Sequence, residues 1–362
     1  MAEIELGYTA DYHVHLRRGE MMEAVAPAVR QGGISIAYVM PNLTPPVTDI
    51  ETVIRYKKEL QILAPKTTFL MTFYLSRLLT PQLVEKAAEL KVIRGIKCYP
   101  AGVTTNSKAG VDLNNFTVFH PIFRVMQKHD LVLNIHGEKP SSINSKDGDA
   151  VTVLNAESKF LPALLKIHQD FPKLKIVLEH CSTKEAIDTI YDINKGLLDD
   201  ETPTVCGSIT VHHLYLTVDD WAGNPINFCK PVAKLPEDRL ALIGAATSGK
   251  PFFFFGSDSA PHDISKKRTH INVSAGVYTQ PYVLSYLAEL FDKVGQLDKL
   301  KGFVSIFGNK FYGMDNEEKL VSKSKCYLVK KSVIIPKLVT HNSINVAVFQ
   351  PGKTFSWSPE WR

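Results

Sequence analysis

Two histidines, His13 and His15, stand two residues apart in a stretch with the composition of a β-strand. Because residues i and i+2 of a strand share a face, both imidazoles point the same way, about 6–7 Å apart along the strand. Two imidazoles on one face are suitable ligands for a metal ion. The pair by itself is weak evidence, because such pairs also occur by chance and more often have a structural role.

Four further ionisable residues stand at the carboxyl ends of apolar stretches that have the pattern of buried strands. They are Lys97, His136, His180 and Asp258. In a parallel barrel these strand ends meet at one mouth, where the active sites of such barrels lie. Chance placement of all four residues together with the histidine pair is improbable. We therefore predict that they form one site.

The elements needed to position these residues are visible as short apolar runs that alternate with amphipathic stretches. We predict strands at 8–15, 35–40, 67–75, 92–99, 131–136, 175–180, 204–210 and 251–256. Helical patterns lie between them, among others at 51–63, 82–90, 116–128, 161–170 and 183–194. Eightfold alternation of strand and helix is the pattern of an α/β fold of the (β/α)8, or TIM, barrel type.

The domain organisation follows from the absence of a linker rich in Pro, Gly or Ser. We expect a single domain in which residues 1–320 form the barrel. Residues 321–362 are expected to form a short C-terminal β-rich appendage packed on it, with strands at 326–329 and 344–349.

Composition narrows the class of protein. With 44% apolar and 22% charged residues, the 362-residue chain is globular rather than disordered or fibrous. The net charge of +5 is small, and we interpret its densest basic cluster, at 266–268, as a solvated loop rather than a nucleic-acid surface. No segment has the roughly 18 apolar residues of a membrane span. We expect neither a nucleic acid nor a membrane as partner.

Cysteine usage indicates the compartment. The five cysteines are widely spaced, odd in number and never form a C-x-x-C pair, which favours reduced thiols over a disulfide framework. The N-terminus shows no apolar leader segment. We therefore expect a cytoplasmic protein.

Lys97 is the unusual member of the candidate site, because a protonated ammonium has no lone pair for a metal. The full set nevertheless resembles the binuclear metal site of the amidohydrolase superfamily. Its members here are His13, His15, Lys97, His136, His180 and Asp258. In that superfamily the lysine is carboxylated on Nζ, and the resulting anion bridges two zinc ions.

Longer motifs, which span about residues 6–357, resemble the dihydroorotase family within that superfamily, in its compact, free-standing form. They are HVHLR from His13, MPNL from Met40, KCYPAGVTTNS from Lys97, NIHGE from Asn134 and GSDSAPH from Gly256. The resemblance implies two Zn²⁺ per subunit, one held by His13, His15 and Asp258 and the other by His136 and His180. Lys97, as N6-carboxylysine, and a hydroxide would bridge them. Asp258 would be the catalytic acid and base.

The resemblance also implies a set of substrate-binding residues. They are Arg17, Asn42, Thr104, Thr105, Lys230, His262 and Ala275. Arg17, Asn42 and His262 resemble the binders of a substrate carboxylate, which suits the bidentate geometry of a guanidinium. The backbone at Lys230 and Ala275 would complete the pocket.

Thr104 and Thr105 lie on a loop with Gly102 and Gly110 at its edges. Glycine at both edges gives hinge freedom, so the loop could close over substrate as a lid. The alternative is an ordinary Gly/Ser/Asn loop.

His212 and His213, which are adjacent in the sequence, follow the seventh predicted strand. We interpret them as packing residues or as supports of the site rather than ligands.

The predicted activity is that of a hydrolase of cyclic amides. The resemblance implies reversible cyclisation of N-carbamoyl-L-aspartate to L-dihydroorotate in pyrimidine synthesis, by a homodimer. One alternative is a dihydropyrimidinase or hydantoinase, but those enzymes usually carry a larger flanking β-domain than residues 321–362 could form. The other is a non-catalytic scaffold of the same fold, against which the presence of every metal-site residue counts.

Overall fold

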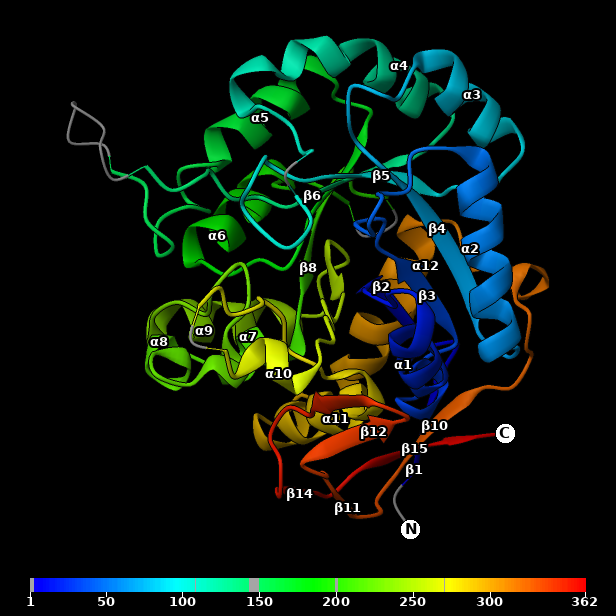
Figure 1. Ribbon diagram of the computed structural model, residues 1–362, viewed down its shortest axis with the longest axis vertical. Coiled ribbons are helices and arrows are strands. Elements are labelled where there is room, and N and C mark those ends of the chain that lie inside the picture. Colours follow the sequence, from blue (N-terminus) through cyan, green and yellow to red (C-terminus); the bar gives the residue numbers. More distant parts are fainter. Residues whose placement is uncertain (1–2, 108, 143–149, 199–200, 270) are drawn as a thin grey trace.

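The computed structural model describes residues 3–107, 109–142, 150–198, 201–269 and 271–362, without the side chains of 113–115 (Figure 1). Residue 108 of the predicted lid loop therefore lies outside the described residues.

A sheet of parallel strands curves round the centre of the molecule (Figure 1). In the described part of the chain it has eight strands, which neighbour one another in sequence order: β2 (Ala10–Val14), β3 (Ile36–Val39), β4 (Thr68–Tyr74), β5 (Gly95–Cys98), β6 (Val132–Ile135), β7 (Lys175–Leu178), β8 (Val205–Ile209) and β9 (Phe253–Phe255). Their continuous apolar runs suit strands that are buried on both faces. Every predicted strand is present, somewhat shorter than predicted, and the TIM-barrel prediction is confirmed.

The sheet closes between β9 and β2 through backbone bonds beside the candidate ligands. The Asp258 N–H donates to the His13 carbonyl at 2.8 Å, and the His15 N–H donates to the Ser259 carbonyl at 3.1 Å. Val14 and Ser259 also form a parallel bridge. Barrel closure therefore fixes the backbone of His13, His15 and Asp258 side by side, although these residues lie at opposite ends of the barrel sequence.

Helices cover the outside of the barrel. The longer ones are α1 (Gly19–Gln31), α2 (Ile50–Leu63), α3 (Pro81–Glu89), α4 (His120–Lys128), α5 (Leu161–Asp170), α6 (Lys184–Ile193), α9 (Pro236–Thr247) and α11 (Val283–Lys293). The shorter ones are α7 (Val211–Tyr215), α8 (Val218–Trp221), α10 (Ile264–Lys267) and α12 (Phe307–Phe311). Side chains of Asp49, Thr80 and Thr183 cap α2, α3 and α6 by accepting a backbone N–H of the first turn.

One helix begins later than the sequence pattern indicates. The segment predicted as helical over 116–128 starts as a 3-10 turn at Leu113–Phe119, and the α-helix begins only at His120. Pro121 stands in the first turn of α4, where its missing N–H leaves no helical bond unmade.

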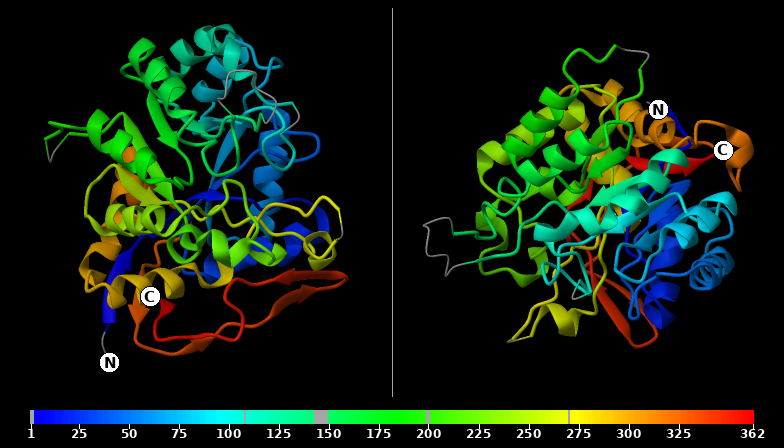
Figure 2. Two further views of the ribbon diagram at one scale, coloured as in Figure 1. Left: turned by 90° about the vertical axis from the view of Figure 1, so that its left-hand side faces the viewer. Right: turned by 90° about the horizontal axis from the view of Figure 1, so that it is seen from above.

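Short antiparallel strands lie together against one side of the barrel (Figure 2). The pairs are β1 (Glu3–Gly7) with β10 (Cys326–Val329), β10 with β15 (Ser358–Trp361), β11 (Val333–Ile334) with β14 (Thr354–Phe355), and β12 (Leu338–His341) with β13 (Ile344–Ala347). The first strand of the chain thus joins the sheet of the appendage. The division of the chain at residue 320 stays a prediction.

Two further observations concern the whole described chain. None of its helices has the length and apolar character needed to cross a membrane. Each of the five cysteines is a buried, free thiol.

Candidate active site

A pocket opens where the carboxyl ends of the barrel strands meet. It takes in most of the residues that the sequence indicated: His13, His15, Arg17, Asn42, Thr104, Thr105, His136, His180, Lys230, Asp258 and Ala275. Lys97 is fully buried, and its Nζ lies 5.1 Å from the ring centroid of Tyr99, which lines the pocket. His262 borders a neighbouring hollow and approaches Arg17.

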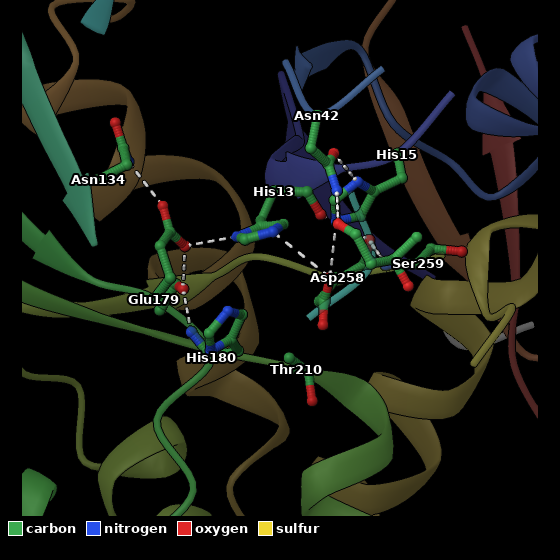
Figure 3. A network of polar contacts seen from close by, with 12 residues as sticks. His13, His15, Asn42, Asn134, Glu179, His180, Thr210, Asp258 and Ser259 are labelled. Carbon is green, nitrogen blue, oxygen red and sulfur yellow. Dashed lines mark hydrogen bonds and ion pairs between the residues drawn. The ribbon is translucent and has the colours of Figure 1, made fainter. Parts of the chain in front are cut away.

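Three of the candidate ligands converge most closely. His13, His15 and Asp258 are buried, and their potential ligand atoms all lie within 4.8 Å of one another. Oδ1 of Asp258 is 3.4 Å from Nε2 of His13 and 3.0 Å from Nε2 of His15 (Figure 3). A carboxylate oxygen and two imidazole nitrogens are a donor set that Zn²⁺ accepts.

The hydrogen bonds of the two imidazoles show that this convergence suits a cation. Nδ1 of His13 faces the Glu179 carboxylate at 2.8 Å, so it carries the proton. Nδ1 of His15 faces Oδ1 of Asn42 at 2.8 Å, and the Asn42 amide is oriented by its Nδ2 bond to the Thr105 carbonyl. Nε2 of each ring is therefore directed at the Asp258 oxygen. These three side chains could together hold one metal ion.

His136 and His180 form the adjacent part of the site. Their ring centroids are 4.6 Å apart, and the His180 centroid is 5.1 Å from that of His13. Nε2 of His136 donates to the Glu138 carboxylate at 2.9 Å, which leaves its Nδ1 as a free ligand atom. Nδ1 of His180 has no hydrogen-bond partner among the described residues. These histidines can hold a second cation beside the first.

Burial lowers the pKa of His15, His136 and His180 and so favours their neutral, metal-binding forms. Burial lowers the pKa of His15 to about 4, although its hydrogen bond to Asp258 opposes the shift. The pKa of His180 falls well below its usual value because of burial and then of the nearby His136 and Lys97. Burial alone would raise the pKa of Asp258, but the His15 hydrogen bond and the two histidines hold it below its usual range.

Lys97 has an environment that suits carboxylation. Its Nζ is buried and has no hydrogen-bond partner in the part of the chain that the structure describes. Burial lowers the pKa of Lys97 to about 8, while Glu179 and Asp258 act in the opposite direction. A neutral amine can react with carbon dioxide, whereas an ammonium cannot, and an unpaired buried ammonium is costly. The carbamate would place an anion between the two groups of ligands.

Backbone strain marks the same region. Arg17, His180 and Asp258 adopt left-handed conformations, with φ of 59°, 40° and 43°. Such a conformation costs a residue with a Cβ about 1–2 kcal/mol. Strain of this kind persists where the surrounding structure enforces it, and it is typical of active sites. None of these positions is a glycine, so this strain could not be predicted from the sequence.

Arg17 dominates the other end of the pocket. Its Nε donates to the Pro261 carbonyl at 3.0 Å, and its Nη2 lies 3.2 Å from Nε2 of His262. Nε2 of His262 is 2.9 Å from the Ala275 carbonyl and therefore donates to it. Burial, and then the charges of Arg17 and Lys267, lower the pKa of His262 to about 2. Among the described residues no carboxylate pairs with Arg17, so its charge is available to an anionic ligand.

The loop that carries Thr104 and Thr105 is fastened over the pocket. Asn42 donates from Nδ2 to the Thr105 carbonyl at 3.1 Å, and Asn106 donates from Nδ2 to the Asn42 carbonyl at 3.0 Å. The Thr105 hydroxyl reaches the Ala275 carbonyl at 3.5 Å. Both threonines line the pocket, as a lid requires.

Sequence reasoning did not assign a role to the carboxylates that orient the histidines. Glu179 accepts from His13 Nδ1, from the Ser208 hydroxyl and from the Asn134 amide at 2.6 Å. Glu138 does the same for His136. The available signal was an acidic residue at or just beyond the end of an apolar strand, since a buried carboxylate needs such partners.

In a second cluster of potential ligands, His212, His213 and Cys229, the last two are already hydrogen-bonded, whereas the ring nitrogens of His212 have no partner among the described residues. Nδ1 of His213 contacts the Thr210 hydroxyl at 2.8 Å and its Nε2 the Pro231 carbonyl at 3.0 Å. The Cys229 thiol donates to the same carbonyl at 3.1 Å. These contacts support the interpretation of His213 as a packing residue.

The interpretation of the basic cluster at 266–268 as a solvated loop is wrong for Lys267. This residue ends helix α10 and is buried, because its Nζ donates to backbone carbonyls inside the protein.

The TIM barrel and the group of histidines, aspartate and buried lysine at its mouth define the class: a hydrolase of the amidohydrolase superfamily. A dihydroorotase from Saccharomyces cerevisiae is 56% identical over 360 residues, which cover 99% of this chain and 98% of that protein. The crystal structure of dihydroorotase in complex with 5-fluoroorotic acid from Saccharomyces cerevisiae has a TM-score of 0.98 and 55% identity, over 100% of this chain and 99% of that chain.

An L-hydantoinase (dihydropyrimidinase) from Arthrobacter aurescens has a TM-score of 0.77 at 14% identity, over 98% of this chain and 82% of that chain, which shows a common fold alone. No protein-family model matches the sequence. The chain belongs to the dihydroorotase family. The prediction of an enzyme, a hydrolase acting on cyclic amides, is confirmed.

Proposed function

We propose that this enzyme interconverts L-dihydroorotate and N-carbamoyl-L-aspartate at a centre of two zinc ions. The observation that carries the proposal is the convergence of the His13 and His15 imidazoles on the Asp258 carboxylate, beside the unpartnered amine of Lys97. His13, His15 and Asp258 would hold one cation, and His136 and His180 the other. Lys97, carboxylated on Nζ, would contact both.

When bound, two divalent cations would lower the pKa of water and polarise the ring carbonyl that the water attacks. The residues around them would transfer the proton and orient the ligands. Asp258 accepts the proton of the attacking water and delivers it to the ring nitrogen as the amide C–N bond breaks. In ring closure the same carboxylate takes the proton from the carbamoyl nitrogen. Glu179 and Glu138 hold His13 and His136 in the tautomers that bind metal.

Arg17, Asn42 and His262 would bind the carboxylate that the substrate keeps throughout the reaction. The guanidinium supplies paired donors. One amide proton of Asn42 is bonded to the Thr105 carbonyl, and the second is available to the substrate. The backbone at Lys230 and Ala275 completes the pocket, and Thr104 and Thr105 close it.

Metal analysis combined with an assay tests the proposal. We expect about two zinc ions per chain, turnover in both directions, loss of activity on chelation and recovery with added Zn²⁺. His180→Asn should lower the zinc content, because it removes a ligand. His168→Asn, on α5, is the matched control and should keep both ions. Activity that survives complete removal of metal would refute the proposed centre.

The lid gives a separate prediction. The double variant Thr104→Ala, Thr105→Ala should lower kcat about 10- to 100-fold, since each lost hydrogen bond in the closed complex costs about 1 kcal/mol. Zinc content should stay unchanged because neither residue is a ligand. Thr247→Ala, which removes a hydroxyl bonded within α9, is the control. Loss of zinc from the double variant would show instead that the loop is structural.

We infer a cytoplasmic homodimer as the working form of the enzyme. Five free thiols support a reducing compartment. The family resemblance supports the dimer, which light scattering on the purified enzyme tests directly.

A further inference from the structure

Lys267 is a buried lysine, 3% exposed, at the end of α10. Its Nζ donates hydrogen bonds to the carbonyl oxygens of Phe228 at 2.8 Å, Ser274 at 3.0 Å and Gly276 at 2.8 Å. An ammonium has three N–H donors, so these bonds use its whole capacity. No acidic side chain pairs with Lys267 in the described ranges, and its charge is therefore compensated by backbone dipoles.

The carbonyls that Lys267 binds belong to two segments of the pocket wall. Phe228 precedes Lys230 by two residues, and Ser274 and Gly276 flank Ala275; Lys230 and Ala275 both line the pocket. The Gly276 N–H also donates to the Phe228 carbonyl at 3.0 Å. Lys267 and this bond together tie the two segments to each other.

The directions of the carbonyls at 274–276 show how Lys267 orients this part of the pocket wall. Those of Ser274 and Gly276 face Lys267, whereas that of Ala275 between them faces the opposite way, as in an extended segment. The Ala275 carbonyl accepts from Nε2 of His262 at 2.9 Å and from the Thr105 hydroxyl at 3.5 Å. Lys267 thus orients the group on which both a candidate carboxylate binder and the lid rest.

Tight packing would transmit any displacement of this wall. Gly276 has φ of 150°, and a Cβ placed on it would lie 2.5 Å from the Ala260 carbonyl oxygen and 3.1 Å from Cδ2 of His262. The backbone at Gly276 therefore packs closely against Ala260 and His262, so a displacement of this wall would meet His262.

We propose that Lys267 is a positioning residue for recognition of the substrate carboxylate. It holds the wall segment 274–276 against His262 and the lid. The proposal rests on the proposed function. The charge of Lys267 also lies close enough to influence His262, and it adds to the positive potential of Arg17 at this end of the pocket. The candidate metal ligands lie on other segments, so Lys267 affects substrate binding and selectivity rather than the metal centre.

Lys267→Met tests this, because methionine is unbranched and apolar and has no donor. We expect KM for dihydroorotate and Kd for 5-fluoroorotic acid to rise about 10- to 100-fold, as for a binding group displaced by a fraction of an ångström to 1 Å. The preference for dihydroorotate over dihydrouracil should fall, while kcat stays within about threefold and zinc content is unchanged. Lys267→Gln keeps two N–H donors and should show a smaller loss of affinity.

Lys175→Met is the matched control. Lys175 opens β7 at the far end of the barrel, has a side chain that is 17% exposed, and donates to the Phe311 carbonyl at 3.0 Å. It should lose stability at most, with KM unchanged. Unchanged affinity in Lys267→Met, an equal loss in Lys175→Met, or loss of zinc from the Lys267 variants would overturn the proposal. So would failure of Lys267→Gln to fold, which would indicate a structural role. Failure of the wild-type enzyme to turn over dihydroorotate would instead refute the proposed function.

Discussion

Replacing Lys97 with alanine is expected to lower kcat for dihydroorotate by at least about a thousandfold, equivalent to ~4 kcal/mol in the activation barrier. The physical reason is that two cations would face each other with no anion between them, and the electrostatic gain from each cation would be lost with their spacing. Steady-state assay of the variant, with its zinc content measured on the same sample, gives the result.

Added small carboxylic acids distinguish the bridging role from a merely structural one. Acetate or propionate can occupy the space that alanine vacates and supply the missing anion, so partial recovery of turnover is expected in Lys97→Ala. Lys97→Met is the control, because its side chain fills the same space and should prevent recovery. Wild-type activity in Lys97→Ala without any added acid would eliminate the bridging role.

Arg17→Ala is expected to cost about 3–5 kcal/mol of transition-state binding, which lowers kcat/KM for dihydroorotate roughly 150- to 5,000-fold. A pocket built around a charged group rejects a ligand that lacks the partner charge, because the buried guanidinium is then left unpaired. The wild-type enzyme should therefore use dihydrouracil, which lacks the carboxylate, very poorly. The variant should lose most of this preference.

Arg18→Ala is the control for Arg17. Arg18 is the next residue, but it packs over the Tyr56 ring at 5.9 Å and does not line the pocket. It should leave the preference for dihydroorotate intact. Equal turnover of dihydrouracil and dihydroorotate by the wild type would contradict the proposed function and favour a hydantoinase-like activity.

The barrel and most of the pocket were predictable from local patterns. A strand buried on both faces must be apolar throughout, so the run that became β9 was recognisable without knowledge of its neighbours. The polar residue that ends such a run lies at the barrel mouth for geometric reasons. His136 and Asp258 could therefore be assigned to one pocket although they are far apart in the chain.

Strand limits were less predictable. β2 ends at Val14, so His15 lies just beyond the strand rather than within it, and the face shared by His13 and His15 comes from barrel closure as much as from strand periodicity. Apolar composition continues past the last ladder bond, and it therefore overestimates the length of each barrel strand.

The sequence by itself determined the fold class and indicated the candidate ligands and the candidate lid loop, because strand periodicity and contiguous motifs are local properties of the chain. Only the tertiary structure decided which imidazole nitrogen faces Asp258, since that depends on Glu179, 166 residues from His13, and on Asn42 beside His15. It also decided that Lys267 is buried. Burial of this lysine is tolerated because backbone carbonyls accept hydrogen bonds from its ammonium group. Those carbonyls come together only after segments distant in the chain have packed against each other.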